Sequence, residues 1–401
     1  MSLIFILGGH PKLSLIEIER HLALSPQVAN EKFALFETDS SPHLLQSTLG
    51  GTQKIAITLS PAIPNFSPST LTELIAQDLI ASHPTGKLIY GLSVYSTKSI
   101  GHPLKSLVEQ ITPSIKTLLK ANQRSARFIV GNGAPLPTVA VSGQGLLSHG
   151  GEYLLLESET GIMLAKTIAV QDVDSWAKRD LGRPRRNAKQ GMLPPKLARL
   201  LLNLAGPITA NTIVLDPFCG SGTVLMEAGL MGANTVYASD INPTAVKDTI
   251  SNLSWLQAEF GQGLPENFRL QAAISPAEKL SETKPDWLGV VDYLVTETTL
   301  GTPKQGQETA TAIQIELKSL ETLYREAFLN LRPLLKPTAI IVIAAPEHII
   351  DNRSFTLPVD LLLHPLGYRS LLPNGPLIYH RPQQKVGRSI WIFKLTDALN
   401  D

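Results

Sequence analysis

Residues 212–223 place an acidic side chain next to two closely spaced glycines, where an apolar run turns into a helical pattern. The apolar run predicts a buried strand, and Asp216 follows it, ahead of Gly220 and Gly222. Glycine lets the backbone approach a ligand more closely than other residues do. Asp240 ends the next predicted strand, where a carboxylate can hold both hydroxyl groups of a ribose. Together these features predict a site for a cofactor that contains adenosine.

The acid beside the glycines narrows the class of cofactor. A carboxylate at Asp216 would repel a pyrophosphate, and the loop lacks the third glycine of a dinucleotide-binding turn. It suits a ligand with an ammonium group, and S-adenosylmethionine has one. We expect S-adenosylmethionine to be bound by residues in and around this loop: Asp216, Phe218, Gly220, Gly222, Thr223, Asp240, Ile241 and Ala277.

Alternating strand and helix patterns position these residues. Strands are predicted over residues 212–216, 235–240, 268–274, 290–296, 338–344 and 389–395. Helices are predicted over residues 195–205, 223–231, 242–259 and 308–333. This alternation is typical of a parallel sheet with crossover helices.

The glycine loop resembles a known motif. The stretch Asp216-Pro217-Phe218-Cys219-Gly220-Ser221-Gly222-Thr223, with Glu227, resembles the first motif of class I methyltransferases that act on exocyclic amines of nucleic-acid bases. Upstream, residues 171–184 and 192–199 resemble the THUMP-domain tRNA guanosine-N2 methyltransferases, which modify position 10. The resemblance is strong over residues 168–255, and in the first 160 residues it rests on the order of elements. It implies S-adenosylmethionine as the cofactor and tRNA as the partner.

The resemblance also implies a domain order. An N-terminal ferredoxin-like domain over 1–70, a THUMP RNA-binding domain over 71–168 and a basic linker over 169–194 would precede a Rossmann-like α/β methyltransferase domain over 195–401. The two N-terminal domains are expected to be α+β, and residues 138–142 are predicted as one of their strands. The Pro- and Ser-rich stretch 61–68 predicts the linker between these two domains.

A loop after the fourth strand of the catalytic domain carries the acceptor chemistry in this family. There the usual pattern is Asp or Asn, two prolines and an aromatic residue, but this chain has Glu297-Thr298-Thr299-Leu300. We expect Glu297 to accept a hydrogen bond from the guanine N2 amine, while Thr298, Thr299 and Leu300 line the base pocket. Without the prolines and the ring the loop loses rigidity and base stacking, so a non-catalytic tRNA-binding relative is the alternative. A DNA base or a protein amide as the acceptor is a third hypothesis.

Positive charge is concentrated in one segment of a nearly neutral chain. The chain has 35 basic and 34 acidic side chains, yet residues 178–199 hold eight Lys or Arg and one Asp. We expect this segment to contact RNA phosphates, and the alternative is a solvated linker. The expected RNA contacts are Lys178, Arg179, Arg183, Arg185, Arg186, Lys189 and Lys196. A second basic segment, residues 379–388, is predicted as a hairpin that either contacts RNA or faces solvent.

Composition excludes several other classes. One cysteine in 401 residues cannot form an internal disulfide, and no run of about 18 apolar residues predicts a membrane span. The first residues lack the basic leader of a signal peptide, so a cytoplasmic location is expected. The nine histidines have no metal-binding spacing, and no metal is expected. The oligomeric state stays open.

Overall fold

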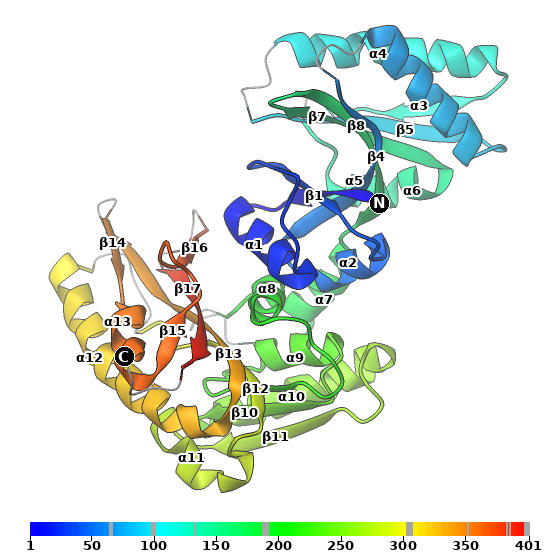
Figure 1. Ribbon diagram of the computed structural model, residues 1–401. Helices are drawn as coiled ribbons and strands as arrows, with labels where there is room; N and C mark the ends of the chain where they lie inside the picture. The colour runs from blue at the N-terminus through cyan, green and yellow to red at the C-terminus, as the bar shows by residue number, and fades with distance from the viewer. Residues whose placement is uncertain are drawn as a thin grey trace. The chain divides into compact units, whose positions relative to one another are not determined.

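The computed structural model describes residues 1–63, 67–97, 102–131, 134–186, 192–301, 308–350, 353–381, 384 and 386–396. The chain forms two compact units (Figure 1). Unit 1 comprises Met1–Leu15 and Leu22–Asp174, and unit 2 comprises Ile16–His21 and Ser175–Asp401. None of the described helices combines the length and the apolar character that a membrane span requires.

Unit 1 is built on one mixed sheet with the strand order β2-β3-β1-β4-β8-β7-β5-β6. Its strands are β1 (Ser2–Leu7), β2 (Val28–Ala29), β3 (Phe33–Glu37), β4 (Thr52–Ile63), β5 (Leu88–Tyr95), β6 (Ala126–Ile129), β7 (Gly150–Ser158) and β8 (Gly161–Val170). Its helices are α2 (Pro42–Thr48), α3 (Pro68–Ser82), α4 (His102–Ala121), α5 (Thr138–Gly143) and α6 (Leu146–His149). Helix α1 (Pro11–Leu22) is divided, with residues 16–21 assigned to unit 2. Because β4 pairs with both β1 and β8, this sheet is continuous across the two predicted N-terminal domains.

Two predictions in this unit need correction. The linker predicted over 61–68 is partly strand, since β4 continues to Ile63 and α3 begins at Pro68; residues 64–66 lie outside the described residues. The strand predicted over 138–142 is the helix α5, which begins after Pro137. Val141 in α5 is fully buried beside Leu136 and Leu146, so packing overrides the strand preference of its valines.

Unit 2 contains a second sheet with the strand order β11-β10-β9-β12-β13-β17-β15. The main-path strands are β9 (Ile213–Asp216), β10 (Thr235–Asp240), β11 (Arg269–Ile274), β12 (Val291–Glu297), β13 (Leu335–Ile350), β15 (Tyr368–Ser370) and β17 (Val386–Leu395). The two further strands are β14 (Arg353–Thr356), paired with β13, and β16 (Leu377–Tyr379), paired with β17. The helices are α7 (Val173–Leu181), α8 (Pro195–Ala205), α9 (Thr223–Leu230), α10 (Pro243–Phe260), α11 (Leu280–Thr283), α12 (Ala310–Leu331) and α13 (Val359–Leu363).

The first five strands of this sheet are parallel, and β17 runs antiparallel between β13 and β15. From β9 the chain builds outward through β10 and β11, and then returns to add β12 and β13 on the other side. In a parallel sheet of this kind ligands bind at the carboxyl ends of the strands where the order reverses. The strand order therefore predicts a ligand-binding site at the carboxyl ends of β9 and β12.

Apolar packing holds the sheet between helices. On one face Leu215, Leu294 and Ile341 pack against residues of α12, including Tyr324 and Phe328, in one buried cluster. In Figure 1, α12 runs alongside the strands and next to α13, and α9 and α10 lie apart from these two helices. The strands and helices predicted from residue 195 onward are all present, with ends shifted by a few residues.

Candidate active site

The loop between β9 and α9 depends on two glycines. Gly220 has φ +53° and Gly222 has φ +81°, in the left-handed region that residues with a side chain rarely adopt. A Cβ on Gly222 would also lie 3.0 Å from Cγ2 of Thr249. The conformation of the loop therefore requires glycine at Gly222 for both backbone and packing reasons.

Two side chains of helix α10 anchor the backbone of this loop. The Thr249 hydroxyl donates to the Gly220 carbonyl at 2.9 Å, and Nδ2 of Asn252 donates to the Ser221 carbonyl at 2.8 Å. Both side chains are completely buried. Neither residue was predicted from the sequence, although two polar residues three apart on the inner face of a predicted helix were a usable signal.

Asp216 ends β9 as a buried acid. Its Oδ1 accepts hydrogen bonds from the Phe218 amide at 3.1 Å and the Thr296 hydroxyl at 2.6 Å. Burial raises the pKa of Asp216 to about 7, and the nearby Asp240 and Glu297 carboxylates add to the rise. A positively charged ligand beside this carboxyl would stabilise its ionised form and so lower its pKa.

Asp240 ends β10 and faces the glycine loop. Its Oδ2 accepts a hydrogen bond from the Gly220 amide at 3.0 Å, and its Oδ1 accepts one from the Asn242 amide at 2.9 Å. These bonds fix the orientation of the carboxylate while each oxygen keeps a further acceptor position. Ile241 beside it is 70% exposed, whereas Ala277 is buried.

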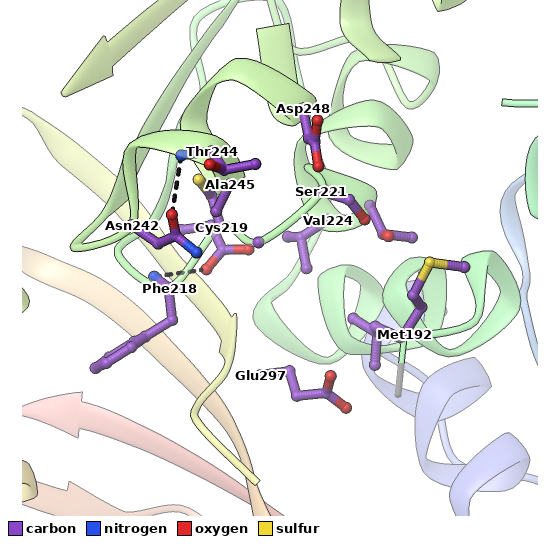
Figure 2. A pocket seen from close by; sticks show the side chains of 14 residues that line it. Met192, Phe218, Cys219, Ser221, Val224, Asn242, Thr244, Ala245, Asp248 and Glu297 are labelled. Carbon is purple, nitrogen blue, oxygen red and sulfur yellow. Dashed lines mark hydrogen bonds between the residues drawn. The ribbon is translucent and has the colours of Figure 1, made fainter. Parts of the chain in front are cut away.

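Two hollows meet at this end of the sheet. The first, of about 670 Å³, is lined by Met192, Leu193, Asp216, Phe218, Cys219, Gly220, Ser221, Thr223, Val224, Asn242, Thr244, Ala245, Asp248 and Glu297. Figure 2 shows Asn242 and Cys219 on one side of this space and Glu297 on the other. The second hollow has a volume of about 1270 Å³, and its lining includes Asp240, Ile241, Ala277 and residues 297–301. Because Phe218, Gly220 and Glu297 line both hollows, a ligand in one would lie next to a ligand in the other.

Glu297 lies at this junction and is paired with an arginine. Its Oε1 accepts a hydrogen bond from Nε of Arg388 at 2.7 Å, and the two side chains are 14% and 3% exposed. Burial raises the pKa of Glu297, and the charge and the hydrogen bond of Arg388 act in the opposite direction. The prediction that the 379–388 segment contacts RNA or faces solvent is therefore wrong for Arg388.

The other residues of the predicted acceptor loop, 298–300, differ in burial and in hydrogen bonding. The Thr298 hydroxyl contacts the Tyr324 hydroxyl and donates to the Ala344 carbonyl at 3.4 Å, and its side chain is buried. Thr299 is exposed, and its hydroxyl accepts a bond from the Gly301 amide at 3.3 Å. Leu300 is half-buried and lines the second hollow. Thr298, Thr299 and Leu300 all line the second hollow, but the Thr298 hydroxyl is directed into the core.

Part of the predicted RNA-binding segment is structural. Arg179 donates to Oε1 of Glu227 at 2.7 Å, and Arg199 donates to Oε2 of the same carboxylate at 2.6 Å. Arg183 donates to the Thr223 hydroxyl at 2.5 Å. Arg179 and Arg183 are 5% and 2% exposed, so the prediction that they contact RNA is wrong. A buried arginine must be paired, and here Glu227 and Thr223 supply the partners.

The remaining predicted RNA contacts are more accessible. Lys178 forms an exposed ion pair with Glu259, and the Arg185 side chain is 60% exposed, 3.8 Å from Asp248. Arg186 is exposed. Lys196 is half-buried over the Trp176 ring, and burial lowers its pKa. Lys189 lies outside the described residues.

Known proteins resemble this chain at both sequence and fold level. Residues 183–261 match the family model of the RMKL-like methyltransferase domain. The tRNA (guanine(10)-N2)-dimethyltransferase of Methanothermobacter thermautotrophicus is 36% identical over 168 residues, which are 41% of this chain and 43% of that protein. The match thus spans less than half of that relative.

Two solved structures match nearly the whole chain. TrmN from Thermus thermophilus has a TM-score of 0.54 at 15% identity, covering 99% of this chain and 100% of its own. SMU.472, a putative methyltransferase complexed with SAH, has a TM-score of 0.50 at 15% identity, covering 99% of both chains. These structures confirm the predicted α/β fold with a Rossmann-like domain, and over residues 183–261 the family model agrees with the methyltransferase resemblance of the glycine loop.

Proposed function

We propose that this chain transfers a methyl group from S-adenosylmethionine to the exocyclic N2 amine of a guanosine in tRNA, with position 10 as the target. The observation that carries the proposal is the convergence of Asp216, Asp240 and Glu297 on two adjoining hollows at the ends of β9, β10 and β12. The match to a tRNA (guanine(10)-N2)-dimethyltransferase supports the acceptor class.

The residues around the glycine loop fit this cofactor. Asp216 offers a buried carboxyl to the ammonium group, which would offset the cost of burying its negative charge. The open acceptor positions of Asp240 suit the two ribose hydroxyls. The exposed Ile241 side chain and the buried Ala277 line the hollow on the adenine side.

The chain's own contribution to the reaction is positioning. When bound, the cofactor supplies an activated methyl group, whose bond to sulfur breaks, leaving the electron pair there, as a bond to the amine nitrogen forms. Glu297 accepts a hydrogen bond from the amine and turns the nitrogen toward the first hollow. One amine proton is released to solvent water after the new bond has formed, so no strong base is needed. Leu300 and Leu323 form an apolar wall for the base.

The same proposal assigns tRNA binding to unit 1, with predicted domains over 1–70 and 71–168 and the linker over 169–194 before the catalytic domain over 195–401. Arg185 and Arg186 are the cations of the basic segment best exposed for phosphate contacts. A tRNA substrate is consistent with the expected cytoplasmic location.

The direct test is methyl transfer to an unmodified tRNA transcript. The chain is incubated with S-adenosylmethionine labelled in its methyl group, and the tRNA is digested to nucleosides. We expect label in N2-methylated guanosine and none in a matched transcript with adenosine at position 10. Label in another nucleoside would contradict the proposed acceptor.

A second candidate function is tRNA binding without transfer. It is favoured by the acceptor loop, where the Thr298 hydroxyl faces the core and Leu300 stands in place of a stacking ring. Tight tRNA binding with no label in any nucleoside would support this candidate over the enzyme.

A further inference from the structure

We infer that Arg388 is the positioning residue of the acceptor site: it holds Glu297 as an anion, with one carboxylate oxygen free to receive an N–H group of the acceptor. This inference rests on the proposed function and specifies how its acceptor site is organised. It also restricts the acceptor to a group that donates a hydrogen bond, which a neutral amine does.

The ion pair reaches across a strand. Glu297 ends β12 and pairs in register with Ala344 of β13, while Arg388 of β17 pairs with Pro346 on the other side of β13. Nε of Arg388 lies 2.7 Å from Oε1 of Glu297. The contact therefore depends on three adjacent strands.

Two further hydrogen bonds hold the Arg388 guanidinium through Nη1. Nη1 of Arg388 donates to Oε1 of Gln384 at 3.2 Å and to the Val386 carbonyl at 3.3 Å. With these bonds in place, Arg388 presents Nε to Glu297 in one geometry. A planar, multiply bonded guanidinium of this kind orients a carboxylate better than a flexible lysine can.

The second oxygen of Glu297 is available for a ligand. Within the part of the chain that the structure describes, Glu297 binds Arg388 through Oε1, and its side chain is 14% exposed. Glu297 lines both hollows, and Figure 2 shows its carboxylate beside the open space. An acceptor group in the second hollow would therefore meet Oε2 next to the donor position.

The surroundings make the arginine necessary. Asp216 and Asp240 at the neighbouring strand ends, and Glu278 on the rim of the second hollow, are acidic, and Tyr324 of α12 is neutral because burial raises its pKa. Arg388 is the cation that contacts Glu297. Without Arg388, desolvation would favour the protonated form of Glu297. A protonated carboxyl loses acceptor capacity at the position where the amine must be held.

Tertiary contacts also replace the rigidity that two prolines would provide. Thr298 is anchored through its hydroxyl to Tyr324, and its amide donates to the Ala344 carbonyl at 3.1 Å. Glu297 is anchored by Arg388. The loop therefore has two consecutive residues tied to different elements of the fold.

Transfer to tRNA is measured for Arg388→Gln, Arg388→Lys and Glu297→Gln from pH 6.5 to 9, with Arg369→Gln, an exposed arginine of β15, as the matched control. At pH 7 we expect kcat of Arg388→Gln to fall at least tenfold while the Kd for S-adenosylhomocysteine changes less than twofold. Raising the pH should restore much of this rate, since Glu297 ionises again, whereas Glu297→Gln should stay slow throughout. Arg388→Lys should retain an intermediate rate.

Three results would overturn the inference: an unchanged rate in Arg388→Gln, a loss that is the same at every pH, or an equal loss of cofactor affinity. If the wild type itself transfers no label, the proposed function is wrong, and thermal unfolding then decides the inference. Arg388→Gln should be destabilised more at pH 8 than at pH 5.5, because the unpaired buried carboxyl has a raised pKa and stability falls as pH rises through it. The double variant with Glu297→Gln should lose this pH dependence, and equal destabilisation of Arg388→Gln at both pH values would overturn the inference.

Discussion

The glycine loop and the acceptor loop both follow strands of the same sheet, but different kinds of contact hold them. In the glycine loop, Gly220 and Gly222 set the backbone, and the Gly220 amide bonds to Asp240 at the end of the next strand. In the acceptor loop, Glu297 bonds to Arg388, 91 residues away, and Thr298 contacts Tyr324. The proposed cofactor side is therefore defined by glycine backbone angles and by contacts with the next strand and helix, whereas the proposed acceptor side depends on side chains farther away in the sequence.

Among the tests of this comparison, the largest effect is expected from removing Glu227. Its contacts with residues distant in the sequence support the helix that follows the glycine loop. Glu227→Ala would leave Arg179 and Arg199 buried and unpaired, so we expect a loss of about 3–5 kcal/mol in the free energy of unfolding. Glu259→Ala, which breaks the exposed pair with Lys178, should cost at most about 1 kcal/mol. Denaturant unfolding measures both. Equal costs would mean that α9 does not depend on the buried pair.

Asp240→Ala tests the cofactor side directly. It removes the acceptor for the Gly220 and Asn242 amides together with the proposed ribose contact, so the Kd for S-adenosylhomocysteine should rise about 10- to 100-fold. Calorimetry measures the Kd, and Asp286→Ala, away from the hollows, is the control. If cofactor titrates the Asp240 variant as well as the parent, the ribose assignment is wrong.

The titration of Asp216 should make the affinity for the cofactor depend on pH. With a pKa of about 7, the carboxyl is mostly protonated at pH 6 and ionised at pH 8, and only the ionised form attracts an ammonium group. The affinity for S-adenosylmethionine should therefore rise by up to about tenfold from pH 6 to pH 8. In the absence of ligand the sign is opposite: the raised pKa means that stability falls as pH rises through about 7. Asp216→Asn should remove both effects, and a flat affinity profile in the parent would rule out this role.

The smallest effect is expected at the exposed cations. Arg185→Gln with Arg186→Gln should weaken tRNA binding only a few-fold and lower the slope of log K against log salt by about 2. Fluorescence anisotropy over a salt series gives the slope, and Arg369→Gln on β15 is the control. An unchanged slope would support the alternative of a solvated linker.

The structure bears out the sequence analysis best where the chemistry is local. The predicted strands around residues 212–216 and 235–240 match β9 and β10, and the predicted glycines have the backbone angles that only glycine adopts readily. The helix at residues 138–143 was missed because the burial of Val141, a tertiary contact, decides it. The same limit applies to Arg179 and Arg183, since charge in a sequence does not reveal whether a partner lies inside the fold.

The order of strands and helices, the glycine turn and the acids at two strand ends follow from the sequence alone, because hydrophobic periodicity and backbone preference act between neighbouring residues. Tertiary structure alone decided that Arg388 meets Glu297, that Glu227 neutralises two arginines, and that the Thr298 hydroxyl is directed into the core. These contacts join side chains far apart in the chain. Folding selects them because a buried charge or hydroxyl needs a partner, and only the packed strands and helices determine which partner is within reach.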